Sequence, residues 1–196
     1  WLISSRAAVL VMTFISAALA GLFALRDGKF DLLRWLALAI GLILAHATNN
    51  LFNDYTDFFK GVDKDNYYRT MYGPHPLAAG LMTPKQLLGY TAGTGGLALV
   101  LGVALVASNG WDPLIWILIG LGAFFVLFYT WPLKYIGLGE FTVIAVWGPL
   151  MVGGTYFVTT GGEWSWPVAI VGLVYALGPT SVLFGKHIDK SEADKV

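Results

Sequence analysis

Six long stretches of this chain contain no Asp, Glu, Lys or Arg, and this limits the possible folds more than any other feature. Most of them approach the roughly 20 residues that a helix needs to cross a hydrocarbon core of about 30 Å. The chain is 57% hydrophobic and 12% charged, which is outside the usual range of soluble domains. We therefore predict an all-α, multi-pass transmembrane helix bundle with spans at Ala7–Leu25, Trp35–Thr48, Leu87–Ala107, Leu114–Thr130, Phe141–Thr160 and Pro167–Phe184.

The charged residues gather in a few loops, although the formal net charge is zero. With six spans, nine of the 12 Lys and Arg residues share one face with most of the acidic residues. The positive-inside rule makes that face cytoplasmic, and we expect the protein to lie in a cell membrane. Arg26, Lys29 and Arg34 lie on the opposite face. The absence of Cys excludes thiolate metal sites, disulfides and cysteine nucleophiles, and we expect no nucleic-acid partner.

A first polar cluster ends the second span. Asn50, Asn53, Asp54 and Asp57 follow an i, i+3, i+4, i+7 spacing, so they lie on one helix face if the helix continues through Asn49, Asn50 and Leu51. Charged groups near the hydrocarbon boundary cost up to about 3 kcal/mol each, so the cluster needs a compensating partner. A hard divalent cation such as Mg²⁺ is the natural one. Asp63 joins the cluster only if the chain turns at Gly61.

A second acidic cluster follows the last span, at 186–195. Asp189 and Glu192 are i, i+3 neighbours, whereas Asp194 is rotated away unless the helix unwinds. Taken alone, this segment is typical of a solvated tail. Opposite the first cluster it predicts the second half of a binding site. Carboxylates bind Mg²⁺ with few protein ligands and leave its other positions to water and phosphate oxygens, so the pair predicts a diphosphate ligand. Lys60, Arg69 and Lys134 could offset the charge of a departing pyrophosphate.

Several other residues keep alternatives open. Pro149 and Pro179 should kink their spans, and the glycines of the third and fifth spans are typical of close helix packing. His46 is interpreted as a hydrogen-bonded core residue, whereas His187 could serve either the site or the interface. Aromatic side chains of the fourth span could shield a cation through their π faces or simply pack; they are Phe124, Phe125, Phe128 and Tyr129.

Two segments resemble the UbiA family of intramembrane prenyltransferases. Asn53-Asp54-Tyr55-Thr56-Asp57, followed by Lys60-Gly61-Val62-Asp63, is similar to the motif that ends the second helix of that family. Its form is closest to the 1,4-dihydroxy-2-naphthoate prenyltransferases of menaquinone synthesis. The segment 129–140, Tyr-Thr-Trp-Pro-Leu-Lys-Tyr-Ile-Gly-Leu-Gly-Glu, resembles the connection between the fourth and fifth helices of the same branch.

The resemblance implies a fold and an activity. The full fold would have nine helices, of which this chain covers about the first two thirds. The chain begins at Trp1 and would be a C-terminally incomplete, single prenyltransferase domain over 1–196, with a cytoplasmic loop at 58–86 that caps the active site. The implied reaction is Mg²⁺-assisted loss of pyrophosphate from an allylic isoprenyl diphosphate. An electron-rich acceptor then attacks the resulting cation.

The resemblance also implies residue roles. Asp54 and Asp57 would hold one Mg²⁺ with help from Asn50 or Asn53, and Asp189 with Asp194 would hold a second. Lys134 and Arg69 would contact the diphosphate, and Tyr129 would lie near the reacting carbon. The chain departs from the family in two places. Ala193 stands where the family has an aspartate, which makes Glu192 a substitute ligand. His75 lies in a loop where the family generally has Arg, so it either replaces a diphosphate contact or sits on the surface.

The predicted function is transfer of a polyprenyl group, geranylgeranyl or longer, to an aromatic acceptor, with 1,4-dihydroxy-2-naphthoate as the first choice. A sibling activity, geranylgeranyl transfer to a glycerol-phosphate lipid or to another quinone precursor, is the alternative. An ion-coupled transporter is the rival of another class, but it predicts ionisable groups near the bilayer midplane, where these spans offer only His46. A structural Ca²⁺ site would not need two clusters and Lys134.

Overall fold

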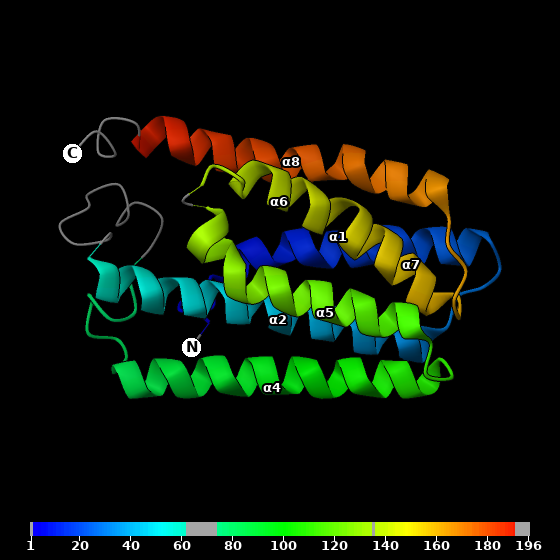
Figure 1. Ribbon diagram of the computed structural model, residues 1–196, viewed down its shortest axis with the longest axis horizontal. Helices are drawn as coiled ribbons and strands as arrows, with labels where there is room; N and C mark the ends of the chain where they lie inside the picture. Colours follow the sequence, from blue (N-terminus) through cyan, green and yellow to red (C-terminus); the bar gives the residue numbers. More distant parts are fainter. Residues whose placement is uncertain (1, 62–73, 135, 191–196) are drawn as a thin grey trace.

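The computed structural model describes residues 2–61, 74–134 and 136–190, without the side chains of 189 and 190. Six spans run side by side along the long axis of the molecule (Figure 1). The first three are α1 (Ala7–Arg26), α2 (Leu32–Lys60) and α4 (Pro84–Ser108). The fourth joins α5 (Pro113–Phe128) to η1 (Tyr129–Leu133), the fifth joins α6 (Gly139–Ala145), η2 (Val146–Gly153) and α7 (Gly154–Thr159), and the sixth is α8 (Trp166–Lys190). The predicted six-helix bundle is confirmed.

Helix α2 is longer than its apolar stretch. Its 29 residues correspond to a length of about 44 Å, which exceeds a hydrocarbon core of about 30 Å. The Asp31 side chain accepts a hydrogen bond from the Arg34 N–H at the start, and Gly61 ends the helix in a left-handed conformation (φ 73°). The helix therefore continues through the whole first polar cluster and carries it to one end of the bundle.

The connection expected at 58–86 is described only in part, at 58–61 and 74–86. Residues 58–60 belong to α2, and α4 begins at Pro84 behind a capping box, in which the Thr83 and Gln86 side chains each accept the other residue's N–H. Both ends of the expected connection thus belong to helices, and residues 62–73 are outside the described part. In the described part, Leu77 packs against Leu51 of α2 and Leu87 of α4, which holds this part of the connection against the bundle.

The fifth span occupies the centre of the bundle. In its most apolar window 61% of the residues are buried, against 11–33% in the other five spans. Tyr156 and Val152 pack against α1 and α8, while Phe157 and Val158 pack against α4 and α5. Large apolar side chains on the outer helix faces remain exposed, for example Leu33, Val100 and Val174. Such a surface is typical of a protein whose solvent is lipid.

The fifth span breaks where its proline predicts. Pro149 lies within η2, and the preceding Gly148 leaves the helical conformation (φ −86°, ψ −107°). By contrast, α8 runs through Pro179 as one helix. At the break, the backbone of Gly148 lies so close to α8 that a Cβ added to Gly172 would be 2.9 Å from the Gly148 carbonyl oxygen. Close packing is confirmed for Gly148, Gly153, Gly154, Gly95 and Gly102, but a Cβ on Gly93 or Gly96 would meet nothing within 4 Å.

Polar contacts tie the helices together at the end of the bundle opposite the first polar cluster. The Arg26 Nε and the Tyr156 hydroxyl each donate to Asp27 at 2.8 Å, and these hydrogen bonds, chiefly that from Arg26, hold the pKa of Asp27 below its ordinary value. Lys29 forms an ion pair with Glu163. These contacts link the α1–α2 connection to the fifth span and to the segment before α8.

The contact between Gly148 and Gly172 predicts a specific sensitivity. Gly172→Ala should lower the free energy of unfolding by about 1–3 kcal/mol, because the added methyl group must displace backbone. Thermal unfolding in detergent micelles measures this. Gly178→Ala is the matched control, because the same helix leaves open space at that position. Equal melting temperatures for the two variants would contradict the close approach of η2 and α8.

Candidate active site

Several helix ends meet at one end of the bundle. Arg6 precedes α1, Asp54 and Asp57 lie in the last turns of α2, Lys134 follows η1, and His187 lies near the end of α8. These ends gather on the left in Figure 1. All five side chains line the same cavity, whose volume is about 1360 Å³. Charged groups that are far apart in the sequence therefore share one chamber.

Asp54 and Asp57 are the most deeply buried charged groups of this chamber among the described residues. They are 1% and 3% exposed and lie three residues apart on α2, so both carboxylates face the same side of the helix. The predicted stripe is confirmed, since Asn50 and Asn53 line the same cavity. Two buried carboxylates one turn apart repel each other and need positive charge close by.

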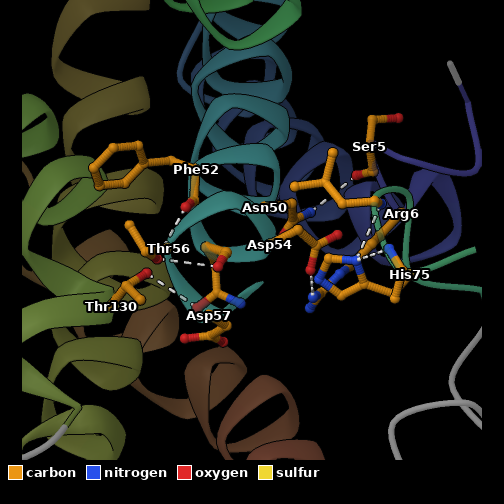
Figure 2. Close-up of polar contacts among 12 residues, drawn as sticks. Ser5, Arg6, Asn50, Phe52, Asp54, Thr56, Asp57, His75 and Thr130 are labelled. Carbon is orange, nitrogen blue, oxygen red and sulfur yellow. Dashed lines mark hydrogen bonds and ion pairs between the residues drawn. The ribbon is translucent and has the colours of Figure 1, made fainter. Parts of the chain in front are cut away.

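Among the described residues, two cations from other elements lie beside these carboxylates. The Arg6 Nη2 forms an ion pair with the Asp54 Oδ1, and the Lys134 Nζ lies 3.8 Å from the Asp57 Oδ2. Figure 2 shows Arg6 reaching Asp54 from the segment before α1. Arg6 is one of the nine Lys and Arg residues that the sequence places on the face predicted to be cytoplasmic, and no further role is predicted for it. The signal that could have identified it is its position directly before the first span, on the same face as the acidic clusters.

The backbone of Arg6 is itself unusual. Arg6 adopts a left-handed conformation (φ 55°, ψ 51°), which costs a residue with a Cβ about 1–2 kcal/mol. Strain of this kind persists only where surrounding contacts hold it. One such contact is the Asn50 Nδ2, which donates to the Ser5 carbonyl oxygen at 3.0 Å (Figure 2). Asn50 therefore fixes the segment that presents Arg6.

The other carboxamides of the cluster also bind protein groups. The Thr130 hydroxyl donates to the Asn53 Oδ1 at 3.0 Å, and the Asn49 Nδ2 donates to the Val126 carbonyl oxygen at 2.9 Å. These bonds tie α2 to η1 and α5, and so fix the distance between Asp57 and the chain that leads to Lys134. A role for Asn50 or Asn53 as a ligand of metal or diphosphate stays a prediction.

Below its charged mouth the cavity becomes apolar. It extends along α2 from Asp57 to Leu38, a distance of about 28 Å for 19 residues of helix. Its deep wall includes Leu105, Ile115 and Val158. His46 lies partway down, where its Nδ1 is 2.7 Å from the Thr13 hydroxyl and its ring packs edge-on against Trp147. His46 is thus the hydrogen-bonded core residue that we predicted, although it also lines the cavity.

Two residues predicted to contact the diphosphate bind other groups in the structure. The Lys60 Nζ lies 5.2 Å from the centroid of the Trp131 ring. His75 is buried, and its Nδ1 accepts hydrogen bonds from the Leu77 and Ala78 N–H groups, which organises the segment before α4. Neither residue lines the cavity. Their predicted contact with diphosphate remains untested.

The aromatic residues of the fourth span divide into two groups. Phe124 and Phe128 are 44% and 41% exposed and face outward, whereas Phe125 and Tyr129 line the cavity. His187 also lines it, and its Nδ1 is 2.9 Å from the Glu140 Oε1 at the start of α6. That contact ties the end of α8 to the fifth span.

The remaining predicted ligands are outside the described residues. Asp63 and Arg69 lie in 62–73, and Glu192 and Asp194 lie in 191–196. The backbone of Asp189 belongs to the last turn of α8, but its side chain is not among those described. The second acidic cluster therefore stays a prediction.

The described residues fit one Mg²⁺ ion with an open coordination shell. No group of three His, Cys, Asp or Glu side chains gathers within the part of the chain that the structure describes. Asp54 and Asp57 supply two carboxylates at the cavity wall, and Mg²⁺ typically takes one or two carboxylates together with water and substrate phosphates. This donor set suits an ion that arrives with a phosphate ligand better than a closed structural site.

Comparison with known proteins identifies several relatives of this chain. A 1,4-dihydroxy-2-naphthoate octaprenyltransferase of Bacillus subtilis (strain 168) is 31% identical over 161 residues, which are 80% of this chain and 50% of that protein. The corresponding enzyme of Escherichia coli (strain K12) is 31% identical over 165 residues, or 81% of this chain and 53% of that protein. A UbiA prenyltransferase domain-containing protein 1 homolog of Drosophila melanogaster is 26% identical over 193 residues, 97% of this chain and 52% of that protein.

The chain spans about half the length of these curated relatives. No solved structure matches it. Residues 14–195 match the UbiA prenyltransferase family, a range that includes the buried carboxylates of α2, Lys134 and most of the residues that line the cavity. The chain therefore belongs to the UbiA prenyltransferase family.

Proposed function

We propose that this protein transfers a polyprenyl group from an isoprenyl diphosphate to an aromatic acceptor, with Mg²⁺ as cofactor. The observation that carries the proposal is the form of the cavity. A mouth with paired carboxylates and cations leads into an apolar chamber that continues for about 28 Å along α2. An isoprenyl diphosphate has the same division, with a polyanionic head and a long apolar tail. We expect the mouth of the cavity to open on the cytoplasmic side of a cell membrane.

The described residues have distinct roles in this proposal. Asp54 and Asp57 would hold Mg²⁺, which, when bound, screens the charge of the diphosphate and of the departing pyrophosphate. Lys134 would contact the leaving group from the opposite wall. The bond between the first carbon of the prenyl chain and the diphosphate oxygen breaks, and its electron pair leaves with pyrophosphate. A carbon of the aromatic acceptor then donates an electron pair to form the new bond, and the ring regains its aromaticity when that carbon loses the proton or the carboxylate group, as CO₂, that it carried.

The apolar wall serves the reaction as well as binding. An allylic cation that meets water becomes an alcohol, so the chamber must keep water from the reacting carbon. Phe125 and Tyr129 line the cavity near its charged mouth, where their π faces can stabilise positive charge. We expect the prenyl tail to extend past His46 toward Leu38 and Ile115.

The identity of the acceptor is the finer part of the proposal. The naphthoate octaprenyltransferases among the relatives and the form of the α2 motif favour 1,4-dihydroxy-2-naphthoate, and hence menaquinone synthesis. Geranylgeranyl transfer to a glycerol-phosphate lipid or to another quinone precursor is the alternative. Purified protein should be incubated with Mg²⁺, geranylgeranyl diphosphate and each acceptor in turn, with pyrophosphate and prenylated product measured. Product with the naphthoate alone supports the first choice, and product only with the lipid overturns it.

An ion-coupled transporter gains no support from the described residues. It would need ionisable groups along a path between the two ends of the bundle. Among the described residues, His46 is the only ionisable His, Asp, Glu, Lys or Arg that lines the cavity between its mouth and its deep wall. At the opposite end, the contacts of Asp27, Lys29 and Glu163 join neighbouring elements.

Loss of one carboxylate should abolish the reaction. Asp54→Asn keeps the shape of the side chain but removes the charge that would bind Mg²⁺, and we expect turnover to fall by at least about 100-fold. The measurement is prenyl transfer at saturating Mg²⁺. Asp27→Asn is the matched control, because Asp27 also pairs with an arginine but lies at the other end of the bundle. Near-normal turnover in Asp54→Asn would remove Asp54 from the metal site.

Loss of Lys134 should chiefly weaken donor binding. Lys134→Met removes a positive charge beside Asp57, and we expect the KM for the isoprenyl diphosphate to rise about tenfold or more, in line with loss of a charge-assisted contact. Steady-state kinetics with varied donor measures this. Lys29→Met, which breaks the pair with Glu163 at the other end, should leave the KM unchanged. An unaltered KM in Lys134→Met would show that Lys134 does not contact the diphosphate.

The deep cavity should select for donor length. Gly41 lines the cavity about 20 Å below Asp54 along α2, and a Cβ there would meet Leu101 at an ordinary 3.7 Å. Gly41→Phe should therefore lower kcat/KM for a long donor, such as octaprenyl diphosphate, much more than for geranyl diphosphate. Ile40→Phe, on the exposed outer face, is the control. An equal effect on both donors would contradict our placement of the tail.

A further inference from the structure

Arg6 and a divalent cation would require the same carboxylate. Arg6 forms its ion pair with Asp54, and Asp54 is also the residue to which the proposed function assigns Mg²⁺. Asp54 is 1% exposed, so water contributes little to the stability of its charge. When no metal is bound, a protein cation must therefore remain beside it. Once a doubly charged ion binds there, the adjacent guanidinium is repelled.

We propose that Arg6 is a built-in counter-ion, which neutralises Asp54 in the metal-free protein and moves to the diphosphate when the metal–diphosphate complex binds. The inference rests on the proposed function and adds an order of events to it. Metal alone must compete with Arg6 for Asp54. Metal that arrives with a diphosphate supplies Arg6 with a new anionic partner, so the two ligands assist each other's binding.

The geometry of Arg6 suits such a transfer. Only one of its terminal nitrogens is engaged by Asp54, and its buried Nε has no hydrogen-bond partner within the described residues. A guanidinium presents several donors in one plane and binds phosphate oxygens in pairs. Arg6 also lines the cavity mouth together with Lys134 and Lys186, where a diphosphate would meet all three. A short movement of the side chain would then exchange one anion for the other.

The backbone around Arg6 limits how far it can move. Its left-handed conformation and the hydrogen bond from Asn50 to the Ser5 carbonyl oxygen hold the segment before α1 in place. The side chain, by contrast, is partly exposed, at 30%. The backbone thus keeps the guanidinium at the mouth while the side chain can change its partner.

Metal binding in the absence of any reaction tests the proposal. Mn²⁺ replaces Mg²⁺ as a paramagnetic probe, and its binding to purified protein in detergent micelles is followed by electron paramagnetic resonance, with and without inorganic pyrophosphate. Wild-type protein should bind Mn²⁺ weakly alone and about tenfold or more tightly with pyrophosphate. Arg6→Gln should bind Mn²⁺ alone more tightly than wild type does, and should lose most of the gain from pyrophosphate.

Two further variants separate charge from geometry. Arg6→Lys keeps the positive charge but not the planar donor set, so Mn²⁺ alone should bind as weakly as to wild type while the gain from pyrophosphate falls. Arg6→Lys also tests the proposal if Arg6→Gln does not fold. If pyrophosphate increased the Mn²⁺ affinity of Arg6→Lys as much as that of wild type, the proposed movement of Arg6 to the diphosphate would be wrong. Arg34→Gln is the matched control at the opposite end of the bundle, because Arg34 is also paired with an aspartate and is 27% exposed. It should bind Mn²⁺ as wild type does.

The outcomes distinguish this inference from the proposed function. If Arg6→Gln binds Mn²⁺ alone no more tightly than wild type does, Arg6 does not compete with the metal and the inference is wrong, whereas the function still stands. If wild-type protein binds neither Mn²⁺ nor pyrophosphate, both the inference and the Mg²⁺ chemistry of the proposed function are wrong.

Discussion

The burial of two carboxylates one helical turn apart is the interaction on which the rest of the structure depends. Asp54 and Asp57 are almost wholly removed from solvent, and this is tolerable only because positive groups from other elements lie beside them. Arg6 comes from the segment before α1 and Lys134 from the segment after η1. The negative charge buried at the end of α2 therefore requires that the chain segments carrying Arg6 and Lys134 lie beside it.

The carboxamides next to these acids give the arrangement its rigidity. Asn49, Asn50 and Asn53 each hydrogen-bond to a different part of the chain, namely α5, the segment before α1, and η1. Inside a bundle with little water such bonds are directional, and they leave few alternative partners. The same helix that carries the acids thus also fixes the positions of the groups that neutralise them.

The shape of the fifth span allows a close-packed bundle to contain a large cavity. This is the most buried span, and its break at Gly148 lets η2 approach α8 closely while Val146, Trp147 and Leu150 still line the cavity. Close contact on one side therefore coexists with open space on the other. Polar contacts join the far end of the bundle, and charge surrounds the mouth. Such a chamber suits a ligand with one charged end and one apolar end.

Much of this organisation could be predicted from residue order. Runs of uncharged residues predict six membrane spans, because a bilayer leaves a helix few alternatives. The spacing of Asn50, Asn53, Asp54 and Asp57 predicts one polar stripe, because helical periodicity is local. Pro149 predicts a break for the same reason. The boundaries are predicted less accurately: α2 reaches Lys60 because neither Gly nor Pro interrupts the chain beyond the apolar stretch until Gly61 ends the helix.

The partners of those residues could not be predicted in this way. The pairing of Arg6 with Asp54 joins positions 48 residues apart, and only the packing of α1 against α2 brings them together. The same holds for the outward position of Phe124, for the turn held by His75 and for the depth of the apolar cavity. Local sequence determines which residues share a helix face, whereas long-range packing determines what that face meets, because contact between helices depends on the shape and charge of every neighbour at once.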